Sequence, residues 1–329
     1  MSTLTGVSYT DFASRLDPDN KIRTIIELLA QTNPILEDMV IVEGNLQTGH
    51  KTTIRSGLPT VTWRLLNYGV QPSKSITSQI TDTCGMLEAY AEVDKALADL
   101  NGNSAAWRLS EDRAFLEAMN QAMATTSVYG SVLTYPERFT GVNPRYAAVG
   151  TDSTVSTYNT VSAYSSASGS DQTSMLLIVW GENTVHGIYP KGSVAGFQHE
   201  DKGQVTLLDA ADGRYEGYRS HYKWDLGLTV RDWRYCVRVC NIDTSAITTS
   251  TVDLFAAMID AYERIPDVNM GRPVFYCNRT VRSWLWKQAA AKSNVNLTID
   301  QPAGKPILSF NGIPIKRNDS ILNTESVVS

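Results

Sequence analysis

A short stretch of the chain, FQHEDKG at residues 197–203, places His199, Glu200 and Asp201 in succession. Imidazole and carboxylate groups together serve as metal ligands or as general acid–base pairs. Successive residues of a strand or turn point in different directions, however, and Lys202 follows directly. We therefore interpret the stretch as a polar turn, and we keep a hydrolase centred on His199 as an alternative.

The cysteines form a second candidate for chemistry. Cys236 and Cys240 lie within RYCVRVCNI, which alternates like a strand, while Cys84 and Cys277 are far away in the sequence. Residues four apart on a strand are about 13 Å apart, too far for one zinc ion. The scatter also gives no disulfide framework. We predict buried, reduced thiols.

Other catalytic signatures are absent from the sequence. It holds no GxSxG elbow, no Walker A loop, no HExxH motif and no GxGxxG motif following a strand. We predict that the chain is not an enzyme and uses no cofactor or metal. Basic and aromatic side chains interleave over residues 214–240, as in a stacking platform for single-stranded nucleic acid. Nucleic-acid binding by this strand is thus an alternative function, although Asp225 and Asp232 dilute its charge.

Composition places the chain among soluble globular proteins. Its 329 residues are 42% hydrophobic and 19% charged, with a net charge of −5. No apolar run approaches the roughly 20 residues that span a bilayer, so we expect no membrane association. The first residues carry no secretory signal pattern, and we expect a protein of the cytosol or one that leaves the cell by another route.

The first half of the chain is predicted to contain helices and one extended arm. Residues 18–32 read as a short amphipathic helix. Residues 44–80, rich in Thr, Ser and Gly, read as a two-stranded ribbon with too few apolar residues for its own core, so it needs a partner surface. Two helices are expected next. The first has an apolar stripe made by Met86, Tyr90, Val93, Leu97 and Leu100, and the second runs from an N-cap at Ser110 to a stop at Gly130, with Phe115, Met119, Ala122 and Met123 inward.

The second half is predicted to be richer in strands. Residues 151–173 read as a flexible polar loop, and TSMLLIVWG reads as a buried strand. A hairpin turns at Asp212–Gly213, and its second arm is expected to be broken by Gly217 and Gly227. Residues 251–264 form a predicted helix with Leu254, Met258 and Ala261 inward, and a last strand pair surrounds LSFNGIPIKRNDSI.

Two adjacent segments carry opposite charge. Residues 44–81 contain Lys51, Arg55, Arg64 and Lys74 and no acid, a net charge of +4. Residues 82–120 contain eight acids against three bases, a net charge of −5. Such blocks are a candidate electrostatic pair, with solvated surface as the alternative. On the predicted first helix, three of the acids occupy the flank opposite the apolar stripe: Glu88, Glu92 and Asp99.

The stretch GRPVFYCNRTVRSWLWKQ, residues 271–288, reads as a strand followed by a helix. With Asn278 as N-cap, Val281, Trp284 and Leu285 share the packed face of the helix. Trp286 lies on the other side with Arg279 and Arg282. Two interpretations stay open for Trp286: a ring covered by Arg282 in a cation–π pair, or a contact with another subunit.

Several of these stretches together resemble a known family. PKGSVAGFQHEDKG, GRYEGYRSHYKWDLGLTVRDWRYCVRVCNID, GRPVFYCNRTVRSWLW and FNGIPIKRNDSI are similar to major capsid proteins of tailed bacteriophages, nearest to the short-tailed phages allied to BPP-1 and epsilon15. The resemblance covers most of residues 40–325. It implies an α+β chain with the HK97-like fold, in some relatives with permuted connectivity. Its parts would be an N-terminal arm and helix at 1–43, an E-loop at 44–81, a P-domain with spine helices at 82–245, and an A-domain-like region at 246–329.

The resemblance also implies function and partners. Copies would form hexamers and pentamers of an icosahedral head that encloses double-stranded DNA, held non-specifically. The protein would reside in the virion capsid after assembly in the host bacterial cytoplasm. We expect a separate scaffolding protein, a portal and, in some relatives, a decoration or cement protein. In this fold the E-loop crosses a neighbour's P-domain, so we predict that the basic arm docks on the acidic spine. Trp63, Leu65 and Leu66 must supply much of the affinity, since exposed ion pairs contribute under about 1 kcal/mol each.

Overall fold

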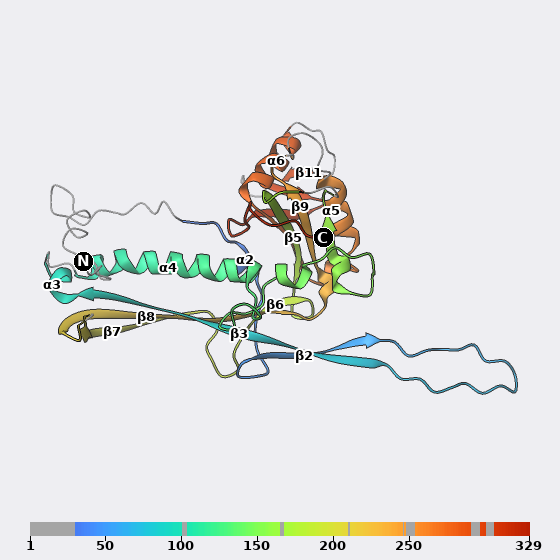
Figure 1. Ribbon diagram of the computed structural model, residues 1–329, viewed down its shortest axis with the longest axis horizontal. Helices are drawn as coiled ribbons and strands as arrows, with labels where there is room; N and C mark the ends of the chain where they lie inside the picture. The colour runs from blue at the N-terminus through green and yellow to red at the C-terminus, as the bar shows by residue number, and fades with distance from the viewer. Residues whose placement is uncertain are drawn as a thin grey trace.

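The computed structural model describes residues 30–100, 104–164, 168–209, 211–245, 247, 254–290, 297–300 and 306–329. Figure 1 shows a long helix lying along extended strands, a lobe of shorter strands and helices at one end, and a two-stranded ribbon that projects past the lobe. The predicted helix at 18–32 falls largely outside the described residues, and residues 30–32 are not helical.

Helices and strands alternate irregularly along the chain. The α-helices of the described residues are α2 (Ile35–Asp38), α3 (Lys95–Ala98), α4 (Ser104–Tyr129), α5 (Leu254–Glu263) and α6 (Arg279–Ala290). The strands are β1 (Ile41–Glu43), β2 (Gly49–Gly57), β3 (Ile76–Asp94), β4 (Thr160–Ser162), β5 (Gln172–Trp180), β6 (Val185–Tyr189), β7 (Phe197–Leu208), β8 (Arg214–Val230), β9 (Cys236–Asp243), β10 (Arg272–Cys277), β11 (Leu297–Asp300), β12 (Ile307–Phe310) and β13 (Ile313–Arg317).

One mixed sheet runs through the molecule in the order β11-β12-β13-β10-β5-β6-β8-β3-β2, with β1, β4, β7 and β9 paired at its sides. Within the lobe, β5 is buried along its entire length because both of its faces are covered. Helices α5 and α6 pack on one face. On the other face lie α2, the C-terminal end of α4 and the segment around Phe139 and Tyr146. The lobe therefore has three layers.

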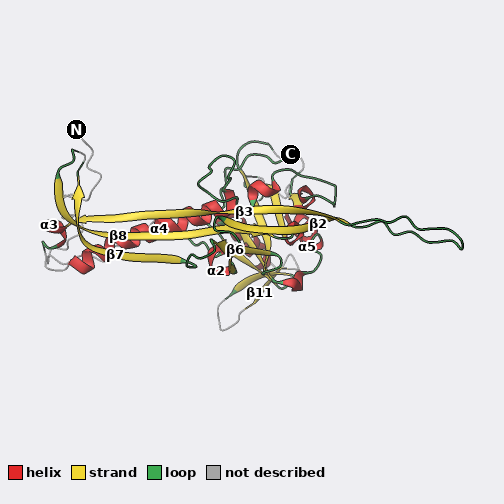
Figure 2. Ribbon diagram, turned by 90° about the horizontal axis from the view of Figure 1, so that it is seen from below, coloured by secondary structure: helices red, strands yellow, loops and turns green. Residues whose placement is uncertain are grey.

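A second layer pair extends away from the lobe. Long antiparallel strands β3, β7 and β8 lie side by side, and α4 covers them (Figures 1 and 2). Met119 of α4 packs with Ala91 of β3 and Tyr222 of β8. Among described residues no helix is long and apolar enough to cross a membrane.

The helix predicted over residues 82–100 is wrong, because most of this segment belongs to the 19-residue strand β3. Gly85, Ala91 and Val93 are buried while Met86 and Tyr90 are exposed, which is the period of two of a strand with one covered face. Pairing with β8 from Cys84 to Asp94 satisfies its backbone. Helix α3 is only four residues long, starting after the N-cap Asp94.

Helix α4 exists as predicted but starts earlier. It begins at Ser104, so Ser110 lies within the helix and is not its N-cap. Its C-terminal end is as predicted: the helix ends at Tyr129, and Gly130 follows where a Cβ would lie 2.4 Å from the carbonyl oxygen of Phe139. Met119 and Met123 face inward, whereas Ala122 is exposed.

The region of residues 151–245 is more regular than predicted. The stretch read as a polar loop contains β4, which pairs with β9. The stretch around His199 is part of strand β7 and not a turn. Strand β8 runs unbroken through Gly217 and Gly227, where a Cβ would meet Leu207 Cδ1 at 2.4 Å and the Thr83 carbonyl oxygen at 2.7 Å. These glycines permit close packing and do not end the strand.

Other local predictions are confirmed. The hairpin turns at Asp212–Gly213, with Asp212 at a φ of 62°. Helix α5 buries Leu254, Met258 and Ala261. The Asn278 side chain accepts a hydrogen bond of 2.9 Å from the Val281 backbone N–H at the start of α6, as an N-cap does.

Two buried ionic clusters attach the ends of the described chain to the lobe. Asp38 of α2 accepts hydrogen bonds from Lys316, Tyr276 and Arg272. Near the C-terminus, Glu325 pairs with Arg238 of β9 at 2.9 Å, and both side chains are almost completely buried. The carboxylate of Glu325 also accepts from three neutral groups: Tyr129, Asn143 and Ser174.

Candidate assembly surfaces

The ribbon of β2 and β3 carries the largest run of exposed apolar side chains. Between the two strands, residues 58–75 form a tip in which Trp63 is 100% exposed. Leu65 and Leu66 are exposed beside it, together with Leu58, Val61, Tyr68 and Val70. Figure 1 shows that this tip extends beyond the rest of the described molecule, so none of the described residues outside the ribbon covers it.

The four cations of this arm are also exposed. Lys51 and Arg55 lie on β2, and Arg64 and Lys74 lie in the tip. Within the described part of the chain none of the four has a carboxylate within 4.0 Å. An exposed surface that combines free cations with large apolar groups is typical of a protein interface.

The root of the ribbon is held by polar groups. Asp82 of β3 is buried and pairs with Arg145 at 2.8 Å. His50 of β2 and His186 of β6 lie edge to face with their ring centroids 5.8 Å apart. Burial lowers the pKa of His186 to about 4, with further lowering from His50 and from the nearby Arg231.

The predicted acidic partner surface differs from expectation. Glu88 and Glu92 lie on the exposed face of β3 and not on a helix. Each already has a cation of β8 as partner. Glu88 lies 3.3 Å from His221 and 3.9 Å from Lys223, and Glu92 lies 2.7 Å from Arg219. Asp99 follows α3 and pairs with Lys95 at 3.6 Å. The acids therefore do not form one free charged stripe.

The second predicted surface lies on α6. Arg279, Arg282 and Trp286 line a hollow of 300 Å³ together with Ser283, Lys287 and Arg317. The Arg282 guanidinium lies 5.5 Å from the centre of the Trp286 ring, so the cation–π pair expected from the sequence forms. Trp286 also packs partly against the core of the lobe.

Residues 199–201 do not form a catalytic group. The ring of His199 stacks on Tyr222 at 4.9 Å, Glu200 pairs with Lys202, and Asp201 pairs with Arg108. The hydrogen bond from Arg108 lowers the pKa of Asp201. Among described residues no group of three or more His, Cys, Asp or Glu side chains is arranged to hold a metal ion.

The thiols are buried or partly buried, as predicted, and all four are free. Burial raises the pKa of Cys236 and of Cys277 to about 12 and that of Cys240 to about 11. These groups are therefore protonated at neutral pH and are poor nucleophiles.

The alternative of nucleic-acid binding by residues 214–240 is not supported. Arg219 pairs with Glu92, Arg234 with Asp232, and Arg238 is buried against Glu325. Two of the aromatic side chains are buried, with Tyr222 and Tyr235 at most 7% exposed. Lys223 pairs with Asp225, so four of the six Arg and Lys side chains of residues 214–240 already have a carboxylate partner.

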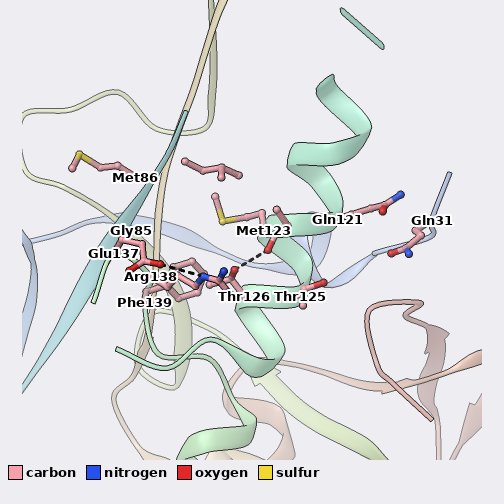
Figure 3. A pocket seen from close by; sticks show the side chains of 12 residues that line it. Gln31, Gly85, Met86, Gln121, Met123, Thr125, Thr126, Glu137, Arg138 and Phe139 are labelled. Carbon is pink, nitrogen blue, oxygen red and sulfur yellow. Dashed lines mark hydrogen bonds and ion pairs between the residues drawn. The ribbon is translucent and has the colours of Figure 1, made fainter. Parts of the chain in front are cut away.

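A further hollow of 460 Å³ lies between α4 and β3 (Figure 3). Its apolar wall comes from Met86, Met123 and Phe139. Glu137 and Arg138 lie at its edge and pair with each other at 3.8 Å. Sequence patterns missed this hollow because β3 was expected to be helical. Its lining suits an apolar side chain of a partner better than a reacting substrate.

Comparisons with known proteins place the chain among capsid proteins. The chain is similar to the capsid subunit in a near-atomic-resolution structure of bacteriophage epsilon15. The two are 42% identical, the match covers 100% of this chain and 98% of that chain, and the TM-score is 0.78. The fold therefore defines the class of phage capsid subunits, and the α+β, HK97-like prediction is confirmed.

The chain belongs to the family described as major capsid protein GP7, whose profile matches residues 17–329. More distant capsids also resemble it. The bacteriophage JBD30 capsid is 11% identical over 89% of this chain and 93% of that chain, with a TM-score of 0.47. The capsid of a native GTA particle is 10% identical over 72% of this chain and 99% of that chain, also with a TM-score of 0.47. No curated protein sequence matches.

Proposed function

We propose that copies of this chain form the hexamers and pentamers of an icosahedral phage head around double-stranded DNA. The observation that carries the proposal is the full-length match, at 42% identity, to a bacteriophage epsilon15 capsid subunit. The residues support a structural role and not an enzymatic one, since the candidate acid–base side chains are paired or stacked elsewhere. Portal, scaffolding and decoration proteins would be further partners of such a head.

The domain limits follow the same proposal. Residues 44–81 would be the E-loop, 82–245 the P-domain with α4 as its spine, and 246–329 the A-domain-like region, after an arm at 1–43. The change of partner along β3 supports the first limit, because β3 pairs with β2 up to Thr83 and with β8 from Cys84, within two residues of the proposed boundary.

The ribbon tip would dock on an adjacent copy mainly through apolar contacts. Burying one large apolar side chain is worth about 1.5–3 kcal/mol, which exceeds the contribution of an exposed ion pair. Because Glu88 and Glu92 already have partners, Arg55 and Arg64 would add mostly orientation and encounter rate. Trp63 is the residue expected to contribute most.

Assembly of the expressed chain, followed by electron microscopy and sedimentation, tests the proposal. The wild-type protein should form capsomers or shells, and the double variant Arg55→Glu, Arg64→Glu should assemble poorly while its subunit stays folded. A matched control is Leu133→Ser, which removes a side chain that is 99% exposed and lies outside β2, β3 and the tip. A wild-type protein that stays monomeric with a suitable scaffolding protein present would refute the function. Normal shells from the double variant would refute only the role of the two arginines.

A further inference from the structure

Helices α5 and α6 lie next to each other on one face of the lobe. Their apolar sides enter the same core, through Leu254 and Met258 of α5 and through Val281 and Leu285 of α6. Phe255 and Trp284 contact each other across the two helices, with ring centroids 5.3 Å apart. In Figure 1 α6 occupies the upper left of the lobe and α5 its right side. Each helix therefore has an outer side, facing away from the core, that the described chain does not cover.

The outer side of α6 is basic. Arg279 and Lys287 are exposed, and Arg282 is half-buried beside them. The only carboxylate described near this hollow, Asp319, is already bound by Arg317 through two hydrogen bonds. The Nε atom of Arg282 is buried and has no hydrogen-bond partner in the described chain. We call the surface of Arg279, Arg282 and Lys287 the basic edge.

The outer side of α5 is acidic. Asp260 and Glu263 lie three residues apart, both exposed, so they share one side of the helix. Neither has a cation within 4.0 Å in the described part of the chain. The neighbouring Arg264 does not neutralise them, because its guanidinium donates to the backbone carbonyls of Tyr158 and Thr160. We call the surface of Asp260 and Glu263 the acidic edge.

We propose that the acidic edge of one copy contacts the basic edge of the next copy around each ring of subunits. The proposal rests on the function proposed above, which requires such rings. A second copy is the occupant that charge complementarity favours, because the two edges are opposite in sign and neither forms an ion pair within 4.0 Å in the described part of the chain. A two-fold contact centred on either edge would place that edge against itself, cation against cation or acid against acid, which is repulsive. A head-to-tail contact, which closes into a ring, brings opposite charges together.

A contact between the acidic and basic edges suits a subunit that must form both hexamers and pentamers. Exposed ion pairs contribute little free energy each. They tolerate small changes in the angle between neighbouring subunits, because long flexible side chains can adjust to keep the charged groups close. The apolar ring of Trp286 beneath Arg282 adds a contact that does not depend on salt. The basic edge could instead bind the phosphates of DNA, and the test below separates the two.

Charge reversal of each edge tests the proposal. Variant A carries Asp260→Lys and Glu263→Lys, and variant B carries Arg279→Glu and Lys287→Glu. Each alone should need a subunit concentration more than tenfold higher than wild type to assemble at about 0.1 M salt, where charges are screened over about 10 Å. Combining all four substitutions should restore assembly. The control Glu182→Lys reverses an exposed charge elsewhere and should leave assembly unchanged.

Mixing the two variants gives a sharper result. Variant A presents only cations at both edges, and variant B presents acids at both edges with Arg282 as the cation left at the basic edge. A and B can therefore alternate around a ring of six but not around a ring of five. The mixture should give hexamers, flat sheets or tubes, and no closed shells. The proposal would be overturned if variant A or variant B alone assembled at the wild-type subunit concentration. It would also be overturned if the variant with all four substitutions, shown to be folded by circular dichroism, assembled no better than A or B.

Two other outcomes are informative. If variant B assembles normally but loses wild-type binding of double-stranded DNA in a filter assay, the basic edge serves the genome and the proposed contact is wrong. If the wild-type chain forms no assembly with a suitable scaffolding protein present, the proposed function fails. Wild-type shells together with normal assembly of A and B would overturn the edge contact alone.

Discussion

Replacement of Glu325 by alanine should destabilise the subunit severely although only four residues follow Glu325 in the sequence. Its carboxylate pairs with Arg238 at 2.9 Å, and both side chains are at most 7% exposed. The substitution leaves the Arg238 guanidinium buried without a counter-ion, which costs about 3–5 kcal/mol in other proteins. The hydroxyl of Tyr129, which donates to Glu325 at 2.5 Å, would also lose its acceptor.

Urea unfolding of the dissociated subunit, followed by tryptophan fluorescence, measures this cost. Glu137→Ala is a matched control, because Glu137 is exposed, 3.8 Å from Arg138, and should change stability by less than about 1 kcal/mol. The double variant Arg238→Met, Glu325→Leu should recover part of the loss, since it removes both charges together. A cost for Glu325→Ala no larger than that of the control would refute the reasoning.

Three further predictions concern other parts of the molecule. Because burial lowers the pKa of His186 to about 4, the unfolded chain binds the proton first, so stability should rise between pH 4 and pH 6.5 by at most about 1.4 kcal/mol per pH unit. In His186→Gln that part of the slope should disappear, and unchanged profiles would contradict the assignment. Trp63→Ser should leave the unfolding of the subunit within about 0.5 kcal/mol of wild type while shell yield falls, and equal effects on both would place the ring in a core. Gly217→Ala should cost about 1–3 kcal/mol because its Cβ would lie 2.4 Å from Leu207, whereas Gly69→Ala, with nothing within 4 Å, should be neutral in the same melting experiment.

Sequence patterns correctly predicted the helices and strands whose signals lie within a short stretch of neighbouring residues. Helix α6 has its N-cap, its buried face and its strand partner within about twenty residues, and all were found. Strand β5 is apolar at nearly every position because it is covered on both faces, which a run of apolar residues reports directly. The uncovered tip was anticipated for a similar reason, since a segment with no core of its own must lie against something else.

Strand β3 shows why the rest was missed. Its apolar residues fit two periods at once: Met86, Tyr90 and Val93 match a helix, and Leu87, Ala91 and Val93 match a strand. What decides between them is pairing with β8, which lies more than 120 residues later in the chain. Local periodicity carries no information on that partner.

The same distant pairing changed the candidate site. Glu88 and Glu92 looked like a free acidic stripe because their cations, Lys223 and Arg219, are supplied by β8. Counting charge along the sequence cannot reveal such neutralisation. The charge of the basic arm was predicted more accurately because, among described residues, no distant carboxylate pairs with its four cations.

The continuity of β3 has a mechanical consequence. The same strand pairs with β2 in the ribbon from Ile76 and with β8 along the body as far as Asp94. A pull on the ribbon directed along β3 therefore loads the hydrogen bonds between Cys84 and Asp94 in shear, all at once, and does not peel them apart one after another. Outward pressure on a closed shell would pull neighbouring subunits in this way wherever ribbons join them. A strand that changes partners without a break makes each subunit resist tension with one of its two longest strand pairings.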